Sequence, residues 1–97
     1  MTTITKKELV DRITKSTQCK NITVKEIVQQ FLDEITAELA KKNRIEFRDF
    51  GVFEVKERAA RTAQNPKTLE KVQVPARRSV KFKMGRIMRE RVNNTDL

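Results

Sequence analysis

The segment from Lys56 to Lys71 constrains the fold most, because it contains almost no side chain able to build a core. Its apolar residues are three alanines and Leu69, whereas alternating apolar residues typical of β-strands occur on either side of it. The dipeptide Asn65-Pro66 near its middle is typical of a tight turn. We therefore expect a long hairpin arm over about residues 56–74, projecting from the rest of the molecule.

Two helices are predicted before this arm. A capping box from Thr5 to Glu8 predicts a helix over about residues 5–17, and a second box beginning at Thr23 predicts a longer one over about residues 23–42. The longer helix carries a wide apolar stripe at spacings of three and four: Val24, Ile27, Val28, Phe31, Leu32, Ile35 and Leu39. We expect a second subunit to cover part of this stripe; the alternative is that it is the core face of a monomer.

Short strands follow, and a helix comes last. Ile45 and Phe47 alternate with charged residues, Phe50-Gly51 marks a turn, and Phe53 begins the next alternation. The pattern resumes after the arm, and residues 84–93 are predicted to form a C-terminal helix. The expected fold class is α+β in one domain over residues 1–97. It comprises a helical dimerisation part (1–43), a three-stranded antiparallel sheet with its β-ribbon arm (44–83), and the short final helix.

Charge and composition narrow the function. The net charge is +9, and twelve basic residues face only three acidic ones between Lys56 and Arg91. Such an excess favours a polyanionic partner. A membrane surface is not expected, because the basic arm lacks bulky apolar groups. The chain has no His and one Cys, Cys19, so we predict no enzyme, no metal, no cofactor and no small-molecule ligand. A lone Cys suits a reducing cytoplasm.

The run from Phe50 to Thr68 resembles the signature of the bacterial histone-like (HU) and integration host factor family. The likeness rests on the spacing of Phe50, Phe53, Arg58 and Arg61 and on the closing Asn65-Pro66-Lys67-Thr68. It implies an intertwined homodimer, or a heterodimer with a paralogue, whose two arms grip the minor groove of double-stranded DNA. It also implies that Pro66 intercalates and kinks the duplex, whereas composition alone favours an ordinary turn proline. Phe50, Phe53 and Phe82 match core positions.

The expected function is therefore an architectural DNA-binding protein that binds largely without sequence preference, bends DNA and compacts the nucleoid. The alternative is an integration-host-factor-like protein that bends defined sites for recombination, replication or transcription. Taken singly, each basic residue can also be read as part of a solvated surface. The expected DNA-binding residues are Lys6, Lys56, Arg58, Arg61, Asn65, Pro66, Lys67, Lys71, Arg77, Arg78, Lys81, Lys83, Arg86 and Arg89.

The chain departs from the family pattern at a few positions. Asp49 stands where Gly is usual, Ala63-Gln64 replaces a Gly-Arg pair, and Leu69 replaces the Gly that commonly follows the Asn-Pro-x-Thr motif. The loss of a basic residue at Gln64 is expected to weaken the arm's electrostatic grip. The missing glycines bear on the turn geometry of the arm and not on the body of the fold.

Overall fold

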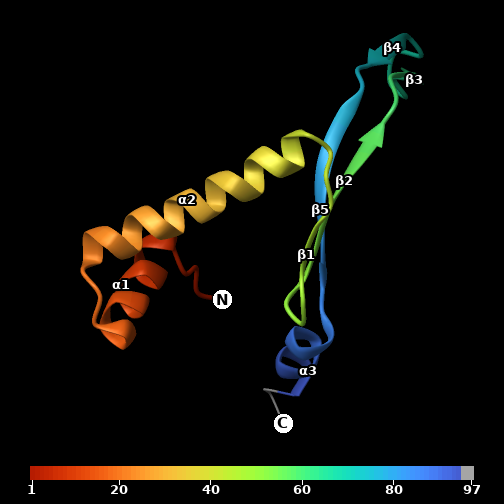
Figure 1. The fold of residues 1–97 in the computed structure, drawn as a ribbon. Coiled ribbons are helices and arrows are strands. Elements are labelled where there is room, and N and C mark those ends of the chain that lie inside the picture. The colour runs from red at the N-terminus through yellow and green to blue at the C-terminus, as the bar shows by residue number, and fades with distance from the viewer. Residues whose placement is uncertain (95–97) are drawn as a thin grey trace. The chain divides into compact units, whose positions relative to one another are not determined.

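The computed structural model describes residues 1–94 and has the predicted α+β class (Figure 1). The chain forms two compact units, one from Met1 to Ala37 and one from Glu38 onward. Its elements, in chain order, are α1 (Lys6–Thr17), α2 (Asn21–Ala40), β1 (Ile45–Phe47), β2 (Gly51–Arg58), β3 (Arg61–Gln64), β4 (Lys71–Val74), β5 (Arg77–Met84) and α3 (Arg86–Asn94).

Helix α1 begins where the capping box predicts and ends at Thr17, the predicted last residue. The Thr5 hydroxyl accepts a hydrogen bond of 3.3 Å from the backbone N–H of Glu8, which satisfies one of the free donors of the first turn. At the other end Gln18 adopts a left-handed conformation with φ 58°, and its N–H donates to the Thr14 carbonyl. The prediction of a helix over residues 5–17 is confirmed.

Helix α2 begins at Asn21, so the predicted start at Thr23 is wrong. The Asn21 side chain donates to Asp11 Oδ1 at 3.1 Å and to Thr14 Oγ1 at 3.3 Å, both on α1. The N–H of Val24 already donates to the carbonyl of Lys20, so the first turn is closed before Thr23 can cap it. The predicted end at residue 42 is also wrong, because Lys42 has φ 68° and the helix ends at Ala40.

The sheet has the predicted three antiparallel strands, in the order β1-β2-β5, and β3 and β4 form a separate two-stranded ribbon. Phe53 lies opposite Ile45 on β1 and opposite Phe82 on β5. Paired residues share a face and successive residues alternate between faces. One face therefore gathers the aromatic side chains, and we call it the ring face.

The turn between β1 and β2 is built differently from the expectation for Phe50-Gly51. The residue with positive φ is Asp49, at 66°, and Gly51 is the first residue of β2. Asp tolerates the left-handed region better than most residues. Gly51 is required by packing instead, because a Cβ there would lie 2.5 Å from the Phe82 ring and 2.7 Å from the Lys83 carbonyl oxygen.

Helix α3 begins at Arg86, so the predicted start at residue 84 is wrong. Met84 still belongs to β5, where it pairs with Gly51. Gly85 follows as the junction, and its N–H donates to the Phe50 carbonyl at 2.8 Å. A strand pairing that continues through Met84 leaves the helix no room to begin earlier.

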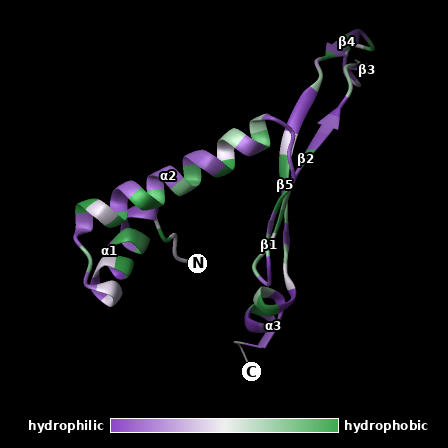
Figure 2. Ribbon diagram, viewed as in Figure 1, coloured by the Kyte–Doolittle hydropathy of each residue, from purple (hydrophilic) through white to green (hydrophobic). Residues whose placement is uncertain are grey.

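The hydrophobic core within one chain is thin. Val10 and Val24, at 4% and 5% exposure, are the only apolar side chains between positions 1 and 94 that are buried. In the second unit Phe47, Phe50, Phe53 and Phe82 form a chain of ring contacts, with centroids 4.8–6.1 Å apart. Apolar residues recur along α2 between polar ones (Figure 2), and several stay exposed, Ile27 at 63%.

Candidate nucleic-acid interface

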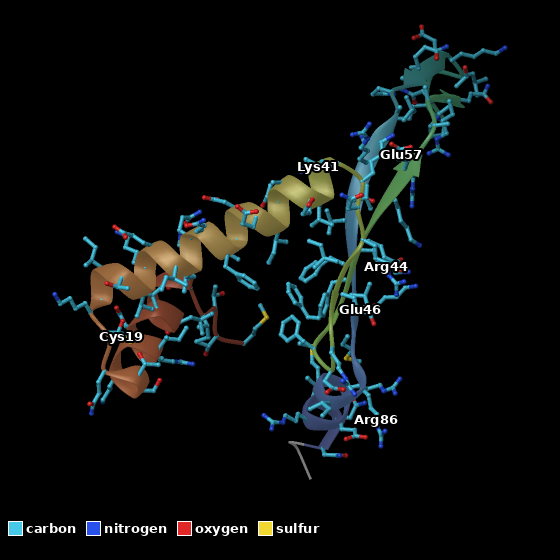
Figure 3. The ribbon with its side chains drawn as sticks, in the orientation of Figure 1. Cys19, Lys41, Arg44, Glu46, Glu57 and Arg86 are labelled. Atoms are coloured by element: carbon cyan, nitrogen blue, oxygen red, sulfur yellow. The ribbon has the colours of Figure 1, made fainter. Side chains whose placement is uncertain are left out.

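The face of the sheet opposite the ring face is lined with cations. Strand alternation places Lys56 and Arg58 of β2 on this side, together with Arg77, Lys81 and Lys83 of β5. We call these five residues the basic face; all belong to the predicted DNA-binding set. In Figure 3 aromatic rings gather on one side of the strands, and Arg44 and Glu46 extend from the other.

The predicted arm is a continuation of β2 and β5. Pairing runs from Gly51 opposite Met84 to Arg58 opposite Arg77, and it resumes from Arg61 opposite Val74 to Gln64 opposite Lys71. The offset between paired residues does not change, so the two ladders form one ribbon, with β3 and β4 at its far end (Figure 1). Pro75 lies in the gap between the ladders, because it has no N–H to donate.

The tip of the arm is the turn predicted from Asn65-Pro66. The Asn65 side chain accepts from the N–H of Lys67 at 2.9 Å, which caps the turn. The N–H of Asn65 donates to the carbonyl of Glu70 at 2.9 Å, and the N–H of Leu69 donates to the carbonyl of Asn65 at 2.8 Å. Pro66 and Lys67 are exposed within this loop. The hairpin is therefore closed around residues 66–69.

Leu69 keeps the left-handed conformation that a Gly adopts easily. Its φ is 61°, in a region that costs a residue with a Cβ roughly 1–2 kcal/mol. Asp49 is in the same region, and both are positions where the family resemblance led us to expect Gly. The turn geometry at these two positions is therefore present without the glycines.

Two glutamates hold some of the predicted cations. Glu57 Oε1 lies 2.8 Å from both Lys42 Nζ and Arg78 Nε, on the ring-face side of β2. Glu54 lies 3.6 Å from Arg44 and 3.6 Å from Lys83 on the opposite side. The structure thus separates Arg78 from the basic face. Arg44 was missed by the sequence prediction, although its alternation with Ile45 and Phe47 could have assigned it to the polar side.

Other predicted cations have no acidic partner. Within the described residues, no carboxylate lies at ion-pairing distance from the side chains of Arg58, Arg61, Lys67, Lys71 or Arg77, all on the ribbon. An open pocket of about 540 Å³ at the gap in the ladder is lined by Arg58 and Arg77 and also by the paired Glu57 and Arg78. The ribbon therefore presents several uncompensated positive charges along its length.

The basic face also brings like charges together. Hydrogen bonding and charge repulsion from Lys56 lower the pKa of Lys81, while the nearby Glu54 acts in the opposite direction. Such crowding opposes the fully protonated state of the free protein. An anion bound between these two ammonium groups would relieve the repulsion.

Lys6, Arg86 and Arg89 lie away from the ribbon in the chain. Lys6 is the first residue of α1, in the other unit, and its Nζ donates to Gln29 Oε1. Arg86 pairs with Glu90 at 3.2 Å on α3, where Arg89 also lies. The structure brings together the cations of the ribbon and the sheet within the second unit, whereas Lys6 belongs to the first unit.

Glu57 yields a prediction about pH. Its pKa is lowered, first by Lys42 and then by Arg78. Because the folded-state pKa lies below the unfolded one, this carboxylate stabilises the fold above the unfolded pKa, and the contribution is lost as pH falls through the folded value. We expect Lys42→Ala to raise the pKa of Glu57 more than Arg78→Ala does, as measured by NMR titration of the side-chain carboxyl. A larger rise in Arg78→Ala would contradict the expectation that Lys42 lowers the pKa of Glu57 more than Arg78 does.

Within residues 1–94, no helix is long and apolar enough to cross a membrane. The same residues contain no group of three or more His, Cys, Asp or Glu side chains arranged to hold a metal ion.

Comparison with known proteins identifies the family. Residues 4–93 match the family model described as bacterial DNA-binding protein. The chain is 42% identical to the probable DNA-binding protein HU of Chlamydia pneumoniae, covering 92% of this chain and 90% of that protein. It is also 42% identical to the integration host factor subunit alpha of Mannheimia succiniciproducens, covering 96% and 95%.

A solved structure resembles it as well. The Anabaena HU–DNA cocrystal structure matches with a TM-score of 0.80 and 32% identity, covering 94% of this chain and 99% of that one. The predicted resemblance is thereby confirmed. The chain belongs to the bacterial DNA-binding protein family that contains HU and the integration host factor subunits.

Proposed function

We propose that this protein is an architectural DNA-binding protein that binds duplex DNA largely irrespective of sequence, bends it and compacts the nucleoid in the cytoplasm. The observation that carries the proposal is the paired ribbon whose Arg58, Arg61, Lys67, Lys71 and Arg77 have no carboxylate partner among the described residues. Cations arranged along a narrow ribbon suit two rows of phosphates flanking a groove.

The proposed mechanism separates affinity from bending. Phosphate neutralisation by the ribbon and the basic face supplies most of the affinity, because it releases counterions from the DNA. Pro66, exposed at the tip, acts as a wedge between base pairs, which costs a few kcal/mol in unstacking and allows the DNA to contact more protein. The deformability of the DNA, more than direct reading of bases, then decides where the protein binds.

The functional unit is a dimer. A single chain buries only two apolar side chains within positions 1–94, and Ile27 of α2 and Val80 of β5 remain 63% and 56% exposed. Burial of such surface against a second copy contributes about 25 cal/mol per Å². A homodimer is proposed, and a paralogue with the same apolar face is the alternative partner. Sedimentation at fixed protein concentration distinguishes a dimer from a monomer.

The alternative function is the bending of defined DNA sites, as the resemblance to integration host factor implies. The chain is 42% identical both to an HU protein and to an integration host factor subunit, so sequence identity does not separate this alternative from the proposed function. Competition between duplexes of random sequence and duplexes carrying a candidate site separates the two. Equal competition supports sequence-tolerant binding, and a large advantage for one site supports the alternative.

The proposal is tested by binding to a labelled duplex, followed by fluorescence anisotropy over a series of salt concentrations. Each neutralised phosphate contributes a slope of about −0.9 in a plot of log affinity against log salt. We expect a linear plot with a slope of several units, and similar affinity for unrelated sequences. Binding that is insensitive to salt, or no binding to duplex DNA, would overturn the proposal.

A further inference from the structure

The tip loop contains one apolar side chain whose position neither folding nor turn chemistry explains. Leu69 is 69% exposed, so burial does not offset its unfavourable left-handed backbone. The other residues between positions 1 and 94 with positive φ and a side chain are Gln18, Lys42 and Asp49, all polar. Leu69 is thus the one bulky apolar residue among the described positions that is held in this conformation.

The backbone of Leu69 is fixed at both polar groups. Its N–H donates to the Asn65 carbonyl at 2.8 Å, and its carbonyl accepts from Gln64 Nε2 at 3.3 Å. The next residue is held as well, because the N–H of Glu70 donates to the Thr68 hydroxyl at 3.3 Å. The side chain therefore projects from a loop that is hydrogen-bonded on both sides of it, and these bonds set the direction in which it leaves the backbone.

Leu69 lies beside the proposed wedge. The loop of residues 66–69 begins with Pro66 and ends with Leu69, and the Asn65 carbonyl that accepts from Leu69 also forms the peptide bond to Pro66. Lys67 within the loop and Lys71 after it place positive charge near this apolar pair, and Glu70, between Leu69 and Lys71, adds one carboxylate, so the segment has a net charge of +1. An apolar group in a segment of net positive charge is complementary to a duplex whose groove walls carry phosphates and whose base pairs expose apolar faces where a step is unstacked.

We propose that Leu69 is a second apolar DNA-contacting residue, so that each arm presents a two-residue tip in which Leu69 packs against the groove beside the step entered by Pro66. The inference rests on the proposed DNA-bending function. Leu is among the side chains that serve as wedges between base steps. A wider apolar tip favours steps that unstack easily, such as pyrimidine–purine steps, so Leu69 also influences which sites are bent.

The test compares variants that relax the backbone but remove the apolar group. Leu69→Gly and Leu69→Asn both suit positive φ, so the hairpin is expected to remain closed, as checked by NMR amide shifts of residues 64–71. Leu69→Met retains an apolar side chain. We expect the Gly and Asn variants to bind a labelled duplex about 4- to 15-fold more weakly, because they bury less apolar area against the DNA than Leu does. Fluorescence energy transfer between the duplex ends should also show less bending, whereas Leu69→Met should stay close to wild type.

Leu69 variants that bind and bend DNA like the wild type would contradict the inference. Equal or tighter binding by Leu69→Gly, with unchanged bending, would show that Leu69 is merely a strained turn residue and would overturn the inference. If the wild type itself fails to bind the duplex, the proposed function fails instead. Wild-type binding and bending alongside unaffected Leu69 variants would reject this inference alone.

Discussion

Replacing Arg58 and Arg61 together by Ala is expected to weaken duplex binding by on the order of 10- to 100-fold at moderate salt. Both side chains lie on the ribbon without a carboxylate partner among the described residues, so their charge is fully available to phosphates. The slope of log affinity against log salt should become shallower by about one unit for each phosphate that the variant no longer neutralises. Fluorescence anisotropy over a salt series measures both quantities.

The matched control removes the same charge elsewhere. Arg12 and Lys15 lie on α1, and both are exposed. If the double variant Arg12→Ala/Lys15→Ala loses as much affinity as Arg58→Ala/Arg61→Ala, net charge alone drives binding and the ribbon has no special role. We expect the control to change affinity only slightly.

The second large effect is on stability. Gly51→Ala is expected to destabilise the fold by about 2 kcal/mol, because overpacking costs typically 1–3 kcal/mol. The added Cβ would lie 2.5 Å from the Phe82 ring and 2.7 Å from the Lys83 carbonyl oxygen, and that carbonyl belongs to the strand paired with β2. With contacts this short the overpacking cost lies near the top of that range, at about 3 kcal/mol, and the stiffer unfolded chain offsets only about 0.4–1 kcal/mol of it, which leaves a net loss of about 2 kcal/mol. Thermal unfolding should therefore show a midpoint lower by roughly 8–16 °C.

Ser79→Ala is the control for Gly51→Ala. Ser79 is exposed on β5 and pairs with Lys56 on the basic face, so the change leaves the ring face intact. Both variants must be compared at one protein concentration, since association shifts the apparent midpoint. An unchanged midpoint in Gly51→Ala would mean that the packing between β2 and Phe82 adjusts without cost.

The elements predicted correctly are those determined by local chemistry. Thr5 caps α1 through its own neighbour Glu8, and Asn65 caps the arm tip through Lys67, so both patterns can be read from adjacent residues. The arm itself was predictable because a segment with so few apolar residues cannot pack in a core. The antiparallel pairing on either side of it follows from the two alternating segments.

The errors and omissions come from interactions between distant residues. Asn21 starts α2 early because its side chain reaches Asp11 and Thr14 on another helix. The role of Gly51 depends on Phe82, far along the chain. Likewise the sequence did not show that Arg78 lies on the opposite side of the sheet from the basic face, where the strand register places it beside Glu57. Spacing within one segment carries none of this information.

The measurement that tests the central claim most directly is bending of an end-labelled duplex by fluorescence energy transfer, with the wild type compared with Pro66→Ala. We predict that both proteins bind with a steep loss of affinity at rising salt, since Pro66 carries no charge, and that only the wild type brings the duplex ends close together. Wild-type binding without bending, or equal bending by Pro66→Ala, would contradict the proposed wedge, and the arms would then act only as a basic coat on DNA.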